Sequence, residues 1–282
     1  MAGTLYLLPT IIADDTLPAA LPPDVIHRAR QLTRFYVEAA KTTRAFLKLL
    51  EHPKPIAELA IEEIGHEPDP AKIDAWLAPV AAGEDAAIVS ESGCPGIADP
   101  GAQLVARAHE LGIRVVPLVG PSSILLTLMA SGLDGQRFAF HGYLPIHEAE
   151  RRGAIEAFER ESAAVSMTQL FIETPYRNQG LLECLVEVLR PQTRLTVATD
   201  VTGAAESIRT MTVAAWRETL QREDVEPLPK LPTVFAFLAP RGSIPRGTAP
   251  RNPGRQPQEH RSSHYKNHGT GKSFRPKRGT GR

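Results

Sequence analysis

The segment SESGCPGIADPG at residues 90–101 has the residue types of a loop that contacts a ligand through its backbone. It follows an apolar run at 86–89 and precedes a helical pattern at 102–111. Its glycines permit positive φ or a close approach to a ligand, its prolines stiffen the chain, and Asp99 can cap the following helix. Such loops bind ligands beyond the carboxyl ends of strands in open parallel sheets. A tightly turned connection without any ligand has the same composition.

The loop lacks the two common nucleotide-binding patterns, GxGxxG and the GK[ST] of a Walker loop. The sequence leaves open whether this loop binds a nucleoside-like ligand. The cysteines, Cys94 and Cys184, have neither CxxC nor Cys/His spacing. This spacing argues against a disulfide framework or a zinc site, and it predicts a cytoplasmic protein without a bound metal.

Carboxylates near the expected carboxyl ends of strands are candidates for proton transfer. Glu38, Glu173 and Asp200 occupy such positions. Each can act as a general base, or serve as a helix cap or an ion-pair partner. Arg177 can bind a phosphate or carboxylate bidentately, or pair with an acidic neighbour at a helix start.

Three other reactive or aromatic side chains have simpler interpretations. His141 in FAFHGYLP fits a histidine whose hydrogen bonds are satisfied, and Tyr143 fits a core aromatic rather than a base-stacking one. Cys94 can be reactive if it lies near a helix N-terminus, but a small residue that fills the loop is the simpler account.

Short apolar runs alternate with helical patterns over the first 118 residues, which predicts a mostly parallel sheet covered by helices. The apolar runs at 5–12, 86–90 and 114–119 are continuous enough to be strands buried on both faces. The runs that predict strands are 5–12, 34–38, 86–90 and 114–119, and the helical patterns lie around 24–33, 42–50, 70–82 and 102–111.

A second series of elements of similar size begins after VGPSS, with the boundary near Pro117 to Pro121. The fold class is therefore α/β, with one domain at 1–118 and another at 119–240. The helices are predicted at 122–131, 150–162, 178–189 and in VAAWRETL, and the strands at 137–145, 168–175, 194–202 and 233–239.

The charge distribution separates the body of the chain from its end. Residues 241–282 contain 11 Lys and Arg against one acidic residue, which leaves 32 − 11 = 21 basic and 32 − 1 = 31 acidic residues in 1–240. The basic segment has few aliphatic residues, so a disordered tail is predicted. It can be a solubilising extension, or an arm for nucleic acid in which Tyr265 and Phe274 stack on bases.

The sequence contains no pattern for export or for a membrane span. MAGTLYLLPTIIADD has no basic segment before its short apolar stretch, and no run of about 18 apolar residues occurs elsewhere. We therefore expect no membrane partner.

The run from AAIVSESGCPGIADPG through GIRVVPLVGPSS and ASGL to RFAFHGYLP resembles the core of the tetrapyrrole (corrin/porphyrin) methylase family. Within the family it is most similar to the branch that methylates small-subunit ribosomal RNA, whose motifs are SDAGTPxISDPG, GIRVVPxPGPSA and RFxFxGFLP. FIETPYRN similarly stands where the family has FYEAPHR.

The resemblance implies two-domain subunits that form a homodimer and bind S-adenosylmethionine in a cleft between domains. The branch implies ribosomal RNA or the small ribosomal subunit as partner, and the ribose 2′-oxygen of a cytidine as acceptor. The residues on the family's cofactor-binding motifs are Ser90, Glu91, Ser92, Gly93, Pro95, Asp99, Pro121, Ser122 and Ser123.

The resemblance to the family also implies catalytic and substrate-binding residues. Glu173 is the first choice of general base because ETPYR retains the E, P and R of its motif, and Glu38 is the second. Lys41, Arg44 and Arg177 are the implied substrate-binding residues.

Several polar residues of the family are missing. VEAAKTTR has Ala39 and Ala40 where the family's AEDTRxTR has Asp and Thr, and Gly203 stands in place of a lysine. These losses keep two alternatives open: a methyltransferase of the same fold that acts on a small molecule such as a tetrapyrrole precursor, or a relative that binds cofactor or RNA without catalysis.

Overall fold

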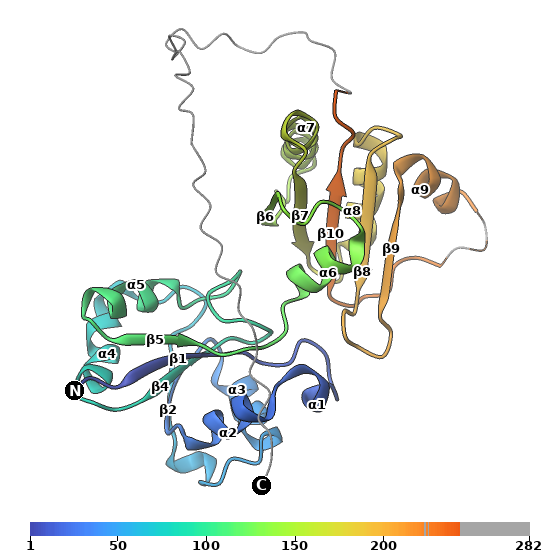
Figure 1. Cartoon of the computed structure of the whole chain (residues 1–282). Coiled ribbons are helices and arrows are strands. Elements are labelled where there is room, and N and C mark those ends of the chain that lie inside the picture. The colour runs from blue at the N-terminus through green and yellow to red at the C-terminus, as the bar shows by residue number, and fades with distance from the viewer. Residues whose placement is uncertain (223, 225, 243–282) are drawn as a thin grey trace, which may run out of the picture. The chain divides into compact units, whose positions relative to one another are not determined.

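In a computed structural model (Figure 1), the chain folds into two five-stranded sheets with helices packed against them. The structure describes residues 1–222, 224 and 226–242. The α/β class is therefore confirmed. The predicted disordered tail lies outside the described residues except for Arg241 and Gly242.

The first sheet is entirely parallel, with strand order β3-β2-β4-β1-β5. Its strands are β1 (Thr4–Leu8), β2 (Arg34–Val37), β3 (Ala60–Glu63), β4 (Ala86–Val89) and β5 (Arg114–Pro117). Its helices are α1 (Leu17–Ala20), α2 (Pro23–Gln31), α3 (Ala40–Leu49), α4 (Ile73–Ala81) and α5 (Ala102–Glu110), with short 3-10 helices at Ile56–Glu58 and Pro70–Lys72.

Alternating side chains of the first sheet build two separate cores, as the two-residue period of a strand requires. Phe35 of β2 packs with α2 and α3 on one face, whereas its neighbour Tyr36 packs with α4 and α5 on the other. Figure 1 shows these helix pairs on opposite sides of the sheet. All four residues of β4 are buried because this strand is central and covered on both faces.

The order of the strands creates a topological switch point between β1 and β4. These strands are neighbours, but the chain leaves β1 over the face covered by α2 and leaves β4 over the face covered by α5. The loops 9–16 and 90–101 therefore diverge at the carboxyl edge of the sheet. Ligands of open α/β sheets bind at such points.

The second sheet is mixed, with strand order β6-β7-β10-β8-β9. Strands β6 and β7 are parallel, whereas β10 runs antiparallel to both β7 and β8, and β9 pairs antiparallel to β8. The strands are β6 (Phe138–Tyr143), β7 (Thr168–Glu173), β8 (Arg194–Thr199), β9 (Ser207–Thr212) and β10 (Thr233–Leu238), and the helices are α6 (Ser123–Ser131), α7 (Glu148–Val165), α8 (Asn178–Val188) and α9 (Val213–Leu220).

The structure differs from the sequence-based expectations mainly at sheet edges. The polar segment AIEE forms β3, and SIRTMT forms β9, although neither was predicted as a strand. Strand β5 was expected to be buried on both faces, but Arg114 and Pro117 are exposed because β5 has only β1 as a neighbour. The first predicted strand ends at Leu8, which leaves residues 9–12 in the loop at the switch point.

Candidate functional site

A cavity of about 320 Å³ lies where loops from both sheets converge. This volume is within the usual range for small-ligand sites. The loop after β1 contributes Ile12, and the start of α6 contributes its N-cap Ser122 and its first residue Ser123. The loop after β4 contributes Ser92, Gly93, Cys94, Ile97, Ala98 and Asp99, and the second sheet contributes Tyr143, Glu173, Thr174 and Pro175 among others.

Gly93 is the point at which the loop after β4 packs most tightly. Its φ is 76°, and a Cβ there would lie 3.1 Å from Ile12 Cγ2 and 3.2 Å from the Pro121 carbonyl oxygen. The Gly93 carbonyl accepts hydrogen bonds from the Thr10 amide, at 2.9 Å, and from the Ser90 hydroxyl, at 3.2 Å. Only glycine satisfies both the positive φ and the short approach.

A second cavity, of about 360 Å³, adjoins the same loops and the exposed side of α3. It is lined by residues 10–14, by Ser90, Glu91 and Ser92, and by Thr42 with its neighbours on α3. The Thr10 hydroxyl is buried and has no hydrogen-bond partner within the described residues. A buried hydroxyl without a partner costs free energy, so Thr10 can gain from binding a ligand.

Carboxylates and one histidine gather beside these cavities. Glu38 accepts a hydrogen bond from the Glu91 amide at 3.2 Å, and its other oxygen lies 3.1 Å from His66 Nδ1. The Thr42 hydroxyl donates to the Glu91 carboxylate at 3.1 Å. The site therefore carries concentrated negative charge, which suits a cationic ligand.

Asp99 shares this environment. Its burial, and next the negative charge of Glu38, raise the pKa of the Asp99 carboxyl to about 6, although the Ser90 hydroxyl and His66 act in the opposite direction. Asp99 is thus half-protonated near pH 6, and a bound cation would favour its ionised form.

The segment before α6 is held by Cys94 and capped by Ser122. The Cys94 thiol donates to the Pro121 carbonyl at 3.3 Å, and the Ser122 hydroxyl accepts from the Leu125 amide. Burial, followed by the charge of Asp99, raises the pKa of the Cys94 thiol. These contacts favour the loop-filling interpretation of Cys94 over a reactive thiol.

Glu173 is the carboxylate that faces the first cavity from the second sheet. Its side chain is 1% exposed, and its Oε1 accepts hydrogen bonds from the Thr174 amide at 2.6 Å and from Arg177 Nε and Nη2 at 2.9 and 2.6 Å. Its Oε2 accepts no hydrogen bond from the residues that the structure describes. Arg177 therefore pairs with an acidic neighbour at the start of α8, the second of its two predicted roles.

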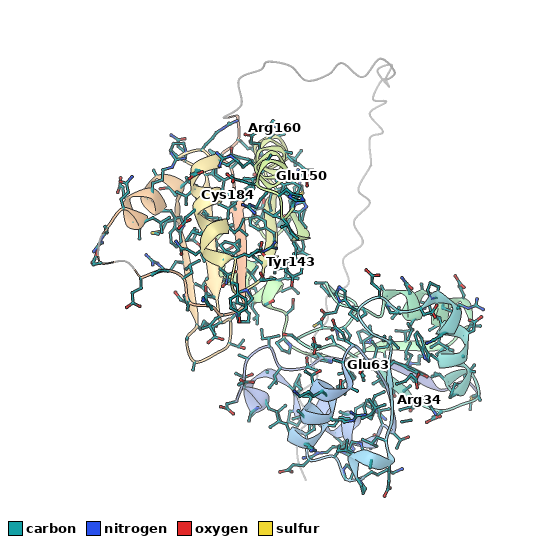
Figure 2. The ribbon with its side chains drawn as sticks, turned by 180° about the vertical axis from the view of Figure 1, so that it is seen from behind. Arg34, Glu63, Tyr143, Glu150, Arg160 and Cys184 are labelled. Atoms are coloured by element: carbon teal, nitrogen blue, oxygen red, sulfur yellow. The ribbon has the colours of Figure 1, made fainter. Side chains whose placement is uncertain are left out.

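Lys41 and Arg44 lie on the exposed face of α3, the helix that lines the second cavity. Within the described residues neither side chain forms an ion pair. The helix begins after Ala39, which offers no side-chain cap, but Glu63 Oε2 accepts a hydrogen bond from the Ala40 amide at 3.0 Å. Glu63, at the end of β3 (Figure 2), thus supplies the carboxylate that Ala39 cannot.

The other predicted residues lie around or behind the cavities. Pro95 lines a neighbouring apolar cavity beside α5. His141 stacks on Phe158 and its Nε2 lies 2.5 Å from Gln169 Oε1, which is the satisfied histidine that was expected. Tyr143 is 57% exposed, which is contrary to the core role expected for it.

The turn between β8 and β9 does not present a side chain in place of the missing lysine. A Cβ at Gly203 would lie 2.3 Å from the Asp200 carboxyl group, and Asp200 Oδ2 accepts a hydrogen bond from the Ala205 amide at 2.8 Å. Asp200 therefore stabilises this turn through a backbone amide, which is neither the helix cap nor the ion pair that were the structural alternatives for it.

Two buried polar residues were not identified from the sequence: Thr10, which lines the second cavity, and Asn178, which supports the start of α8 beside the site. Thr10 was placed inside a strand, although its position before IIADD is where a strand-to-helix loop would begin. Asn178 is fully buried, and its amide donates to the Leu231 carbonyl at 2.8 Å and the Thr233 hydroxyl at 2.9 Å. A polar residue directly after the ETPYR motif was the available signal for this contact.

Comparison with known families matches residues 16–216 to the family described as Tetrapyrrole (Corrin/Porphyrin) Methylases. The chain belongs to this family. As a tetrapyrrole methylase it is an S-adenosylmethionine-dependent methyltransferase, and the resemblance noted in its motifs is confirmed.

Curated relatives match along most of this tetrapyrrole methylase. It is 34% identical over 218 residues to Ribosomal RNA small subunit methyltransferase I of Pseudomonas aeruginosa, a match that covers 76% of this chain and 71% of the relative. It is 35% identical over 207 residues to the protein of the same name from Escherichia coli O157:H7, covering 73% and 68%.

A solved structure shares the fold at low sequence identity. The crystal structure of the methyltransferase CobJ matches with a TM-score of 0.52 and 16% identity, covering 85% of this chain and all of that one. At this identity the likeness shows the fold alone.

In the part of the chain that the structure describes, no cluster of three or more His, Cys, Asp or Glu residues could hold a metal ion. No helix of the described residues is long and apolar enough to cross a membrane.

We predict that Asp99→Asn changes how stability depends on pH. Because the folded-state pKa lies above the usual value, the wild-type protein binds an extra proton on folding between about pH 4 and 6, and it loses stability as pH rises through that window. The variant should be more stable at pH 7 by on the order of 1–2 kcal/mol, with little difference at pH 4. Urea unfolding at both pH values measures this, and a variant less stable at pH 7 would contradict it.

Proposed function

We propose that this protein transfers a methyl group from S-adenosylmethionine to small-subunit ribosomal RNA, at the ribose 2′-oxygen of a cytidine. The observation that carries the proposal is the match, at about one third identity along three quarters of the chain, to relatives named for this RNA. The motifs of the loop after β4 and the ETPYR segment lie within the matched region of the family.

The loops at the switch point fit the cofactor. Gly93 exposes bare backbone to the cavity, Ser92, Ser122 and Ser123 add hydroxyls, and the unpartnered Thr10 hydroxyl lies on the adjoining cavity wall. When bound, S-adenosylmethionine supplies an electrophilic methyl group on a positively charged sulfur. The proposed cofactor-binding residues are Ser90, Glu91, Ser92, Gly93, Pro95, Asp99, Pro121, Ser122 and Ser123.

The charge of the site supports a cationic cofactor. Glu38, Glu91 and Asp99 place their carboxylates beside the cavities, and no lysine or arginine of the described residues lines either cavity. Ionised carboxylates attract a sulfonium and an ammonium group. Pro95 and Pro121 stiffen the backbone of these segments.

Glu173 is the proposed proton acceptor. A ribose hydroxyl must lose its proton as the new bond forms, so a base must lie within hydrogen-bond reach. The Arg177 and Thr174 contacts hold Glu173 through Oε1, which leaves Oε2 to accept that proton. Glu38 is the less favoured candidate because both of its oxygens are engaged, by the Glu91 amide and by His66.

Lys41 and Arg44 are the proposed phosphate contacts. Both are exposed on α3 beside the second cavity, and cations on an otherwise acidic body are suited to guiding RNA to one face. Arg177 acts on the substrate only through Glu173 in this proposal, because its guanidinium already binds that carboxylate.

One observation favours the alternative of a small-molecule substrate. Residues 1–240 carry a net charge of 21 − 31 = −10, which opposes RNA binding, and Ala39 and Ala40 remove polar groups of the family motif. Under this alternative the ribosomal RNA would be unchanged when the protein is absent.

A deletion strain tests the RNA proposal directly. Mass spectrometry of small-subunit RNA fragments should show one methyl group missing, and wild-type protein with S-adenosylmethionine should restore it. Glu173→Gln should slow the restoration by about 10²- to 10⁴-fold, as loss of a general base does. The matched control Glu183→Gln changes an exposed glutamate of α8 and should restore at the wild-type rate. Identical RNA from deletion strain and parent would contradict the proposal.

The protein is also proposed to be a homodimer. Leu125 and Met129, one helical turn apart on α6, are 48% and 78% exposed, and Val119 just before the helix is 69% exposed. Exposed apolar residues in such a row favour burial against a second copy. Sedimentation equilibrium should give about twice the chain mass of 30.7 kDa, whereas the single-chain mass at micromolar concentration would refute the dimer.

A further inference from the structure

We propose that Tyr176 is a stacking platform for the base of an unpaired RNA nucleotide at the mouth of the cavity that Glu173 faces. The inference rests on the proposed function and specifies how the substrate is held. It assigns a role to an aromatic residue that neither the protein core nor the cofactor loops require.

The Tyr176 ring is presented to solvent on a rigid support. It is 82% exposed, the most exposed tyrosine or phenylalanine among the large hydrophobic side chains of the described residues. The preceding Pro175 restricts the backbone, and the Arg177 amide donates to the Thr174 carbonyl at 2.9 Å. An exposed aromatic ring on a fixed backbone loses little conformational entropy when a ligand binds.

Two buried contacts hold this support in place from either side. The Glu173–Arg177 ion pair, with distances down to 2.6 Å, spans the tyrosine and locks the turn. Asn178 then ties the start of α8 to the Leu231 carbonyl and the Thr233 hydroxyl. The buried network therefore fixes the backbone of Tyr176 while its side chain stays outside.

A cation lies against one face of the ring. Lys230 Nζ is 5.4 Å from the Tyr176 ring centroid, which is within the range of a cation–π contact. An exposed aromatic ring beside a lysine offers a stacking surface for a base and a positive charge for the adjacent phosphate. This combination suits a nucleotide better than a purely apolar ligand.

The platform stands at the same sheet edge as the cavity. Thr174 and Pro175, directly before the tyrosine, line that cavity together with Tyr143. Tyr143 ends β6, where it pairs in register with Ile172 of β7, so both tyrosines extend from the carboxyl ends of neighbouring parallel strands. In Figure 2, Tyr143 and Arg160 of α7 lie at opposite ends of the part of the chain that contains the second sheet.

The chemistry of unpaired RNA explains why such a platform is useful. Proteins that act on a single nucleotide take it out of the base stack and replace the lost stacking with aromatic side chains. A base on Tyr176 would hold its nucleotide near the cavity that Glu173 faces from the end of β7. A small planar acceptor can also stack on a tyrosine, and the experiment separates the two.

The test measures methyl transfer by the full-length chain to small-subunit ribosomal RNA, with KM and kcat determined separately. Tyr176→Leu and Tyr176→Ala should raise KM for RNA by about ten- to a hundredfold and change kcat little, because each removes a stacking surface. Tyr176→Phe should behave as wild type. Calorimetry should show unchanged S-adenosylmethionine affinity, and the thermal midpoint should stay constant because the ring is exposed.

Phe138→Ala is the matched control. Phe138 is an exposed aromatic at the opposite end of β6 from Tyr143, and its removal should leave KM unchanged. A wild-type KM in Tyr176→Leu would overturn the stacking role and leave the RNA function standing. A Tyr176→Phe variant as impaired as Tyr176→Leu would also overturn it, because the hydroxyl would then be the essential group. If the wild-type protein methylates a small planar acceptor but does not methylate RNA, both proposals are overturned.

Discussion

The structure of the site depends on a backbone contact between two loops that leave the first sheet in opposite directions. The Thr10 amide donates to the Gly93 carbonyl at 2.9 Å, and Ile12 Cγ2 and the Pro121 carbonyl oxygen lie only 3.1 and 3.2 Å from the position that a Cβ of residue 93 would take. This contact joins the loops after β1 and β4 to the segment before α6. Gly93 of SESGCPGIADPG is thus explained by the space that three backbone segments share, whereas Gly96 and Gly101 are explained by their positive φ.

The two sheets contribute different charged groups to the candidate site. The first sheet supplies carboxylates beside the cavities, and their mutual repulsion contributes to the raised pKa of Asp99. The second sheet supplies Glu173, which Arg177 holds through one oxygen. In the proposed mechanism, Arg177 orients Glu173 through one oxygen and leaves the other for the substrate, and such positioning of a base reduces the cost of proton transfer. The exposed Tyr176 extends from this same turn.

The central elements of the fold could be predicted because their sequences are unambiguous. AAIV is apolar at every position, as a strand buried on both faces must be, and the loop after it has distinctive turn residues. The edge strands could not be predicted in this way. AIEE and SIRTMT bury few side chains, and they form strands only because they pair with a neighbouring strand. Similarly, the motifs predicted a cofactor loop at 90–101, but Glu63 as the cap of α3 and the unpartnered Thr10 hydroxyl depend on tertiary contacts between distant segments. The exposed position of Tyr143 was missed for the same reason.

The central claim is that the loops at the switch point hold S-adenosylmethionine, and hydrogen exchange with and without this cofactor tests it most directly. We expect slower exchange of backbone amides in residues 90–101 and 122–125 when S-adenosylmethionine is added to the full-length chain. Gly93→Val should abolish the protection because its Cβ would strain a positive φ and crowd Pro121, whereas Gly135→Ala, where a Cβ meets nothing within 4 Å, should preserve it. Binding of the cofactor with no protection in these loops, or with protection confined to other parts of the chain, would contradict the account.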